Sequence, residues 1–202
     1  MEKLPPSLEF LSDASCSDLA ALPRSVKKLA IPALFSSWQP YFQSAFPEEG
    51  FPPTLESLEL YDFHTLPPGW TRMLPLSLRR LYLLPSAIGD PFLDALKPLQ
   101  HLELNALYIS CEDTATTQSV SMIHLPKTLT SLVLDFSPYS WEDKDLQHLP
   151  PKLQYLNLGG STRRITKKVT SFLPKSLENL SIGVVPFSWP EDSPDIQTSK
   201  RK

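Results

Sequence analysis

Four histidines and two cysteines are the residues of this chain whose side chains most readily bind metals or act as nucleophiles. His124 and His148 each stand directly before a Leu-Pro pair, so a repeating structure would place them at equivalent positions on neighbouring coils. Phe172 fills the same place before the next Leu-Pro pair, which favours a half-buried structural position over a metal pair. No cysteine or carboxylate spacing completes a zinc site around any histidine, and we expect no metal site.

The two cysteines, Cys16 and Cys111, cannot make a disulfide framework and are expected to be reduced thiols. Cys16 lies near the start of a short predicted helix, "SCSDLAAL", where a thiol pKa can fall, but Asp18 beside it acts in the opposite direction. Neither cysteine has a neighbouring histidine in the sequence. We therefore expect no catalytic cysteine.

Two further stretches could bind anions, and neither has the required pattern. "GGSTRR" at 159–164 lacks the spacing of any phosphate-binding loop and is predicted to be a turn. A basic run follows, and on helical spacing it would form the solvated face opposite Ile165 and Val169; its members are Arg163, Arg164, Lys167 and Lys168. A site for an acidic partner is the alternative for this run. The sequence thus predicts no catalytic residues, no cofactor and no enzyme.

The composition is that of a globular protein, with 41% hydrophobic and 20% charged residues among 202. A net charge of −3 predicts no attraction to nucleic acid or to an anionic membrane. No apolar run has the length of a signal peptide or of a membrane span. We expect an intracellular protein, cytoplasmic with the nucleus as the alternative. The 22 prolines are about twice the usual ~5%, so they must hold fixed positions.

Those positions belong to a repeat, Leu-Pro-x-x-Leu-x-x-Leu-x-Leu, seen clearly in "LPKTLTSLVLDF" from Leu125 to Phe136. The second leucine of the core is present in all eight copies, and the third position fails only in the first copy, at Asp13. The first core position, called the anchor below, is expected at Leu8, Val26, Leu55, Leu78, Leu99, Leu129, Leu153 and Leu177.

This core and its period in the twenties resemble the leucine-rich repeat superfamily over nearly the whole chain. The Leu-Pro-x-x-Leu lead-in resembles the irregular repeats of FNIP-type proteins and the repeat arms of bacterial effector ubiquitin ligases. The asparagine that those families place after the last leucine, where it bonds backbone groups in a ladder, is missing here. Phe63, Ser86 and Ser137 stand in three of its places. The coils must therefore satisfy their backbone by another route.

The residue pattern predicts the same architecture independently. In "SLVLDF", Leu132 and Leu134 point to one face while Ser131, Val133 and Asp135 point to the other. One such strand is unstable alone, and stacking the copies builds a parallel sheet with a continuous leucine core. The proline before each strand fixes φ and sets the angle at which each coil re-enters the sheet. We predict an α/β leucine-rich-repeat solenoid with the sheet on its concave face and short helices or irregular coil on its convex face.

Three segments between strands read as short convex helices. "SWEDKDLQHLP" carries a predicted capping box of Ser140 with Asp143. "GDPFLDALKP" places Asp90 at the N-cap and Pro91 at the first helical position. "RRITKKVTSFLP" spaces apolar residues along one stripe at 165, 169, 172 and 173.

The predicted organisation is one solenoid of about eight irregular repeats over 1–185. Residues 186–202 lose the repeat and gain proline, serine and charge. They are expected to form the remnant of a C-terminal cap, with Phe187 and Trp189 over the last coil, followed by a disordered tail.

The concave face is the candidate interaction surface, because its outward strand positions carry tyrosine, arginine and polar side chains. Strands ~4.8 Å apart would make six coils a strip about 25 Å long. Tyrosine and arginine are favoured at interface hot spots because they combine contact area with a polar group. The alternative is that these aromatic side chains only support the sheet. The candidate partner-binding residues are Tyr61, Arg80, Tyr82, His101, Glu103, Tyr155 and Asn157.

Together these features predict a monomeric, non-catalytic module that binds a protein partner on its concave face. The alternative function is the substrate-recognition arm of a ubiquitin ligase complex, a role that similar repeats fill. That role needs an adaptor-binding box or a catalytic domain, and neither is recognisable in the sequence. The alternative therefore applies if the chain is a fragment or works with a separate adaptor.

Overall fold

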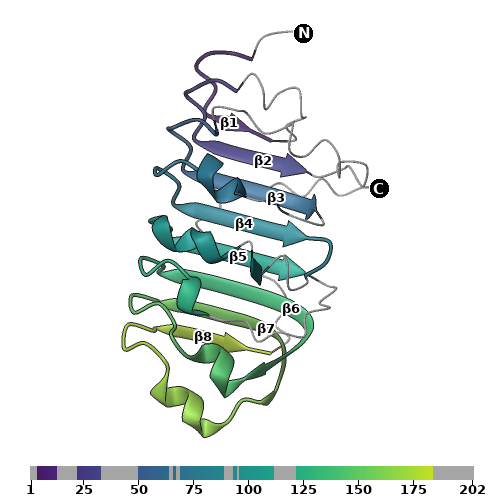
Figure 1. Cartoon of the computed structure of the whole chain (residues 1–202), viewed down its shortest axis with the longest axis vertical. Coiled ribbons are helices and arrows are strands. Elements are labelled where there is room, and N and C mark those ends of the chain that lie inside the picture. Colours follow the sequence, from purple (N-terminus) through teal and green to yellow (C-terminus); the bar gives the residue numbers. More distant parts are fainter. Residues whose placement is uncertain are drawn as a thin grey trace.

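The computed structural model describes residues 4–12, 22–32, 50–63, 66, 69–88, 93–94, 96–111 and 122–183. Within them, eight strands form one sheet in chain order, and every neighbouring pair is parallel. Figure 1 shows the strands as successive rungs from β1 to β8. The predicted leucine-rich-repeat solenoid is confirmed in its sheet order and strand direction.

Each rung is a short strand, and two of them are longer than the rest. The strands are β1 (Phe10–Leu11), β2 (Lys28–Pro32), β3 (Ser57–Phe63), β4 (Arg80–Pro85), β5 (Ala106–Cys111), β6 (Ser131–Glu142), β7 (Tyr155–Arg164) and β8 (Asn179–Ile182). The described residues also form five 3-10 helices. These are η1 (Trp70–Met73), η2 (Lys97–His101), η3 (Met122–His124), η4 (Asp143–Leu146) and η5 (Lys167–Ser171).

The core consists of leucines stacked in register on one face of the sheet. Leu58 pairs with Leu81, Leu81 with Leu107, and Leu132 with Leu156, and all of them are fully buried. Complete burial of one such side chain contributes roughly 1.5–3 kcal/mol. The sheet is therefore held by columns of identical contacts, which no single coil could form alone.

The fifth coil lies in a different register from the predicted one. Its strand is Ala106–Cys111, in which Leu107 pairs with Leu81 and Ile109 with Leu83. The anchor is therefore Leu104, and the predicted anchor Leu99 is wrong because it lies in η2. Both leucines begin a Leu-x-x-Leu-x-Leu or Leu-x-x-Leu-x-Ile pattern, and the β-branched and aromatic residues follow the second.

The Leu-Pro lead-in forms a tight turn at the start of most coils. In these turns the anchor N–H donates to the carbonyl of the proline three residues earlier, at 3.0–3.3 Å. Examples are Leu78 to Pro75, Leu129 to Pro126 and Leu153 to Pro150. Proline suits this place because its carbonyl is used while its missing N–H is not needed. The fifth coil has no Leu-Pro lead-in, and η2 occupies the corresponding segment.

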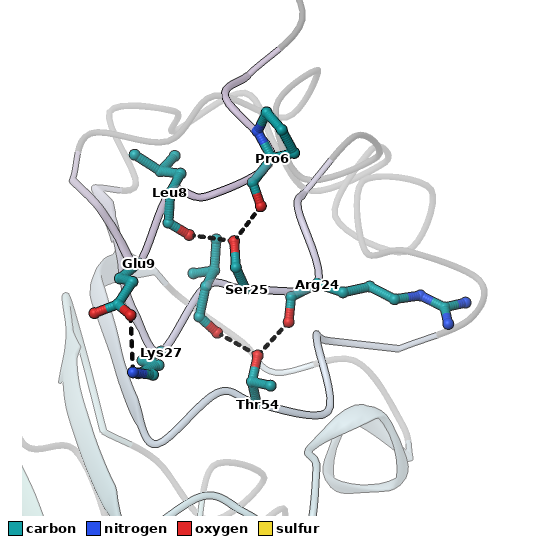
Figure 2. A network of polar contacts seen from close by, with 8 residues as sticks. Pro6, Leu8, Glu9, Arg24, Ser25, Lys27 and Thr54 are labelled. Carbon is teal, nitrogen blue, oxygen red and sulfur yellow. Dashed lines mark hydrogen bonds and ion pairs between the residues drawn. The ribbon is translucent and has the colours of Figure 1, made fainter.

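Serine and threonine hydroxyls replace the missing asparagine ladder. Ser25 Oγ donates to the carbonyls of Pro6 (2.8 Å) and Leu8 (2.7 Å) in the coil before it, as Figure 2 shows. One coil further on, Thr54 Oγ1 donates in the same way to Arg24 and to Val26. Each hydroxyl thus satisfies carbonyls of the preceding coil that no strand partner reaches.

The same bond recurs along the solenoid at the residue just before the anchor. Ser77 Oγ donates to the Leu55 carbonyl, Thr128 Oγ1 to that of Leu104, and Ser176 Oγ to that of Leu153, at 2.7–2.8 Å. We call these bonds the hydroxyl ladder. Its members are Ser25, Thr54, Ser77, Thr128 and Ser176. The fifth and seventh coils carry Glu103 and Lys152 at this position and so interrupt it.

Two of the three predicted helical segments are short 3-10 helices, and one of these starts elsewhere, whereas the third is α-helical at Leu93, Asp94 and Leu96. The capping box is formed by Glu142 and Asp145, two residues after the predicted pair Ser140 and Asp143. The prediction was wrong because β6 continues to Glu142, so Ser140 is paired in the sheet with Ser161. The predicted N-cap and first helical residue, at 90 and 91, lie outside the described residues.

Aromatic packing explains the length of β6. Trp141 is fully buried, its ring lies 5.6 Å from that of Phe136, and Tyr139 meets it edge-on at 4.8 Å. Its Nε1 donates to the Gly159 carbonyl of β7 at 2.6 Å. The "GGSTRR" segment is consequently the second half of β7, and its prediction as a turn was wrong.

The predicted C-terminal cap and tail, 186–202, lie outside the described residues, as does Cys16. Cys111 is a free, buried thiol at the end of β5. Among the described residues, no helix is long and apolar enough to cross a membrane.

Candidate interaction face

The face of the sheet opposite the leucine core is the concave face, and its side chains fall into rows across the strands. The first row, nearest the strand starts, contains Phe10, Lys28, Ser57, Arg80, Ala106, Ser131, Tyr155 and Asn179. The second row contains Ala30, Glu59, Tyr82, Tyr108, Val133, Asn157 and Ser181. Parallel register therefore places side chains from many coils side by side.

The centre of the second row is aromatic and apolar. The rings of Tyr82 and Tyr108 lie 6.0 Å apart with an angle of 34° between their planes. Tyr108 and its other neighbour, Val133, are buried although they face away from the leucine core. Burial raises the pKa of the Tyr108 hydroxyl, and the nearby Asp135 raises it further while a hydrogen bond from Ser110 lowers it. This centre is a packed platform with Tyr82 at its half-exposed edge.

Five of the seven predicted partner-binding residues lie on this face. Arg80 and Tyr155 are in the first row, Tyr82 and Asn157 in the second, and Tyr61 lies further along β3. Tyr61 donates its hydroxyl to Glu59 on the same strand. Their place on the sheet is as predicted, and their role in binding stays a prediction.

His101 and Glu103 do not lie on the concave face, so their predicted placement was wrong. His101 is the last residue of η2 and is exposed, with its Nδ1 against the Pro98 carbonyl. Glu103 precedes β5, and its carboxylate lies 3.5 Å from Arg79. Both errors follow from the five-residue shift of the fifth anchor. The same shift hid Tyr108, which the correct anchor Leu104 places on the concave face.

The acidic groups of this face are engaged within it. Glu59 accepts the hydroxyl of Tyr61. Asp135 lies over Gly159 of β7, where an added Cβ would be 1.8 Å from its Oδ1. Both carboxylates therefore contact neighbouring groups of the same face.

A separate polar cluster joins η4 to the end of β7. Glu142 binds Lys144 at 2.9 Å and Arg164 at 2.6 Å, and these bonds, with the Lys144 bond the larger effect, lower its pKa. Asp143 accepts the N–H of Thr166 at 2.7 Å and also the Thr166 hydroxyl, which lowers its pKa. The cluster is a structural clamp between two successive coils.

The residues of the predicted basic helix face lie on two different elements. Arg164 lies in β7 rather than on a helix, and it is paired with Glu142. Lys167 and Lys168 are exposed on η5, where Val169 is buried. The side chain of Arg163 lies outside the described residues. The basic run is thus a partly neutralised, solvated surface.

Histidine and carboxylate positions offer no metal centre in the described part of the chain, where no group of three potential ligands comes together. His124 is half-buried at the end of η3. His148 is exposed and has a φ of 64°, in the left-handed region.

The fold assignment rests on the observed strands and core rather than on similarity to known proteins. No protein-family model and no curated protein matches the sequence. The crystal structure of CroV588, described as a novel circular LRR protein, is similar at 22% identity and a TM-score of 0.48. The match covers 89% of this chain but only 28% of that one. Strand order, register and leucine core are those of a leucine-rich-repeat fold. The FNIP type remains a resemblance carried by the lead-in sequence.

Proposed function

We propose that the protein is an interaction module that binds a protein partner on the concave face without catalysis. The single observation that carries this proposal is the parallel register, which places Arg80, Tyr82, Tyr155 and Asn157 on one face. Arginine and tyrosine are enriched among the few residues that contribute most of the binding energy at protein interfaces. A preformed sheet also orders these side chains before binding, which lowers the entropic cost of association.

The proposal gives the two faces different roles. On the concave face, Tyr82 and Tyr155 are half-exposed over a rigid sheet, so truncating them removes contact area from a partner. On the convex side, Lys167 and Lys168 are exposed on η5 and lie away from that face. Substitutions at these two pairs therefore separate concave binding from convex binding.

The test is affinity purification from cells with the full chain, followed by quantitative mass spectrometry. Three versions are compared: the natural chain, Tyr82→Ala with Tyr155→Ala, and Lys167→Ala with Lys168→Ala as the matched control. Partners are expected to fall at least tenfold with the tyrosine variant and to persist with the lysine variant, because interface tyrosines are common hot spots. Circular-dichroism melting checks that both variants remain folded.

Partners retained by a folded tyrosine variant would overturn the proposal. If partners were lost only with the lysine variant, the binding site would lie on the convex side. Ubiquitin-ligase components among the proteins lost with the tyrosine variant would favour the substrate-recognition arm over a simple interaction module.

A further inference from the structure

Two consecutive arginines at the start of β4 have opposite environments. Arg79 Nη1 donates to the carbonyls of Leu76 (2.8 Å) and Leu78 (3.2 Å), and its Nη2 lies 3.5 Å from Glu103. The guanidinium of Arg79 is therefore engaged in contacts within the protein. Arg80 is exposed, and its side chain has no hydrogen-bond or carboxylate partner among the residues that the structure describes.

The surroundings of Arg80 leave room for a ligand. Its neighbours in the first row are Ser57 and Ala106, whose side chains are small. Tyr82 lies two residues further along the same strand and the same face, and the Tyr108 ring packs beside Tyr82 at a tilt of 34°. The guanidinium of Arg80 is therefore flanked by two small side chains and lies near the aromatic pair Tyr82 and Tyr108.

Across β2 to β5, the first two rows of the face carry two cations, Arg80 and Lys28, against one carboxylate, Glu59, so their net charge is positive. Glu59 accepts the neutral Tyr61 hydroxyl and keeps its negative charge. Lys28, in the same row as Arg80, is two strands away, about 9.6 Å from strand spacing alone. Lys28 also lacks an ion pair in the described part of the chain. A partner that leaves these cations uncompensated would lose affinity.

We propose that the concave face selects protein segments that carry a carboxylate side chain, which Arg80 binds, beside an apolar side chain that packs on Tyr82. The guanidinium fork matches a carboxylate bidentately, which a lysine at this place would not do. This inference rests on the proposed function, since it names the chemistry of the partner for the same face.

The test uses a phage library of random ten-residue peptides selected on the immobilised full chain. Peptides that also bind the folded Tyr82→Ala, Tyr155→Ala variant are removed, so that only binders of the concave face remain. These binders are expected to be enriched in Asp and Glu. A synthetic binder should lose about 10- to 100-fold in affinity with Arg80→Gln, and equally when its own carboxylate is changed to an amide.

Arg24→Gln is the matched control, because Arg24 is an exposed turn arginine whose side chain points away from the coil in Figure 2. It should leave the affinity unchanged. Concave-face binders without acidic residues, or with full affinity for Arg80→Gln, would overturn this inference while the proposed function stands. If no peptide depends on Tyr82 and Tyr155, the proposed function fails and this inference fails with it.

Discussion

At the scale of single residues, the close approach of β7 to β6 depends on two consecutive glycines. Gly159 passes beneath Asp135, and its carbonyl accepts the Trp141 indole N–H at 2.6 Å. Gly160 has a φ of +102°, and a Cβ there would lie 2.6 Å from the Tyr139 carbonyl oxygen. The clash at Gly160 involves backbone carbonyls of β6, which can move only if the strand shifts, whereas the clash at Gly159 involves the side-chain carboxylate of Asp135.

Gly160→Ala should therefore destabilise the protein strongly, by about 3 kcal/mol or more, because strain at positive φ adds to a backbone clash. Gly183→Ala is the matched control. Its φ is +109°, but a Cβ there meets nothing within 4 Å, so only the conformational cost of about 1–2 kcal/mol applies. Urea unfolding of both variants measures the difference. Equal losses would show that the clash with β6 is unimportant.

Single residues of the candidate site were predictable where the repeat register was unambiguous. Tyr82 and Tyr155 follow from the alternation of strand side chains alone. Tyr108 does not, because it requires the correct choice between two overlapping leucine patterns. The contrast between Arg79 and Arg80 also lies beyond the sequence, because it arises from carbonyls and a carboxylate brought together by the turn.

At the scale of the element, each coil docks on the previous one through the same set of bonds. Backbone N–H groups at the start of one strand donate to a carbonyl of the coil before, as Arg79 and Arg80 do to Glu56. The hydroxyl ladder adds a side-chain bond at the residue before the anchor. Lys152 occupies that position in the seventh coil and contributes no hydroxyl.

The ladder predicts two substitutions of opposite sign. Thr128→Val keeps the shape of the side chain but removes the bond to the Leu104 carbonyl, so it should cost about 1 kcal/mol. Lys152→Ser should add the equivalent bond to the Leu129 carbonyl and stabilise by roughly 0.5–1 kcal/mol. Denaturant unfolding of both variants and of the natural chain checks these signs. A stability loss with Lys152→Ser would refute the equivalence of the coils.

Element boundaries were less predictable than element order. The sequence indicated helical segments at 140–149 and 165–173, and the structure has 3-10 turns at 143–146 and 167–171. Trp141 accounts for the first difference, because its burial against Phe136 keeps the chain extended to Glu142. A capping-box pattern contains no information about such a tertiary contact. The predicted box therefore lies two residues before the observed one.

At the scale of the whole molecule, the interior coils are buried better than the last one. Leu132 and Leu156 are fully buried, whereas the equivalent Leu180 of β8 is 41% exposed. The pairing of β6 with β7 also continues beyond the leucine core, to Glu142 and Arg164. Stability in a repeat protein is a sum over neighbouring coils, so it should vary along the chain.

Native-state hydrogen exchange should therefore be slowest for the amides of β6 and β7 and much faster for those of β8. The expected difference follows from local opening of the last coil, whose core leucine is already accessible to solvent. Mass spectrometry of proteolytic fragments after deuterium labelling resolves these strands. Equal protection of β8 and β6 would indicate a single cooperative unit.

The global architecture was the most predictable property, and the fifth coil shows why it was not predicted completely. A choice of Leu104 gives distances of 26 and 25 residues to the neighbouring anchors, against 21 and 30 for Leu99. Regular spacing was therefore available as a criterion, and the leucine pattern alone was not sufficient. The long β6–β7 extension had no comparable signal, because it arises from aromatic packing between coils.

The shared docking bonds of the coils have a consequence for how such a molecule can change in evolution. The segments 125–148 and 149–172 each span 24 residues and begin with the same Leu-Pro turn. A gene duplication of one such unit would insert a coil that already carries the donors and acceptors its neighbours require. The recognition surface would lengthen in steps of about 4.8 Å. The surface could then fit a larger ligand without changes to the sequence of the other coils.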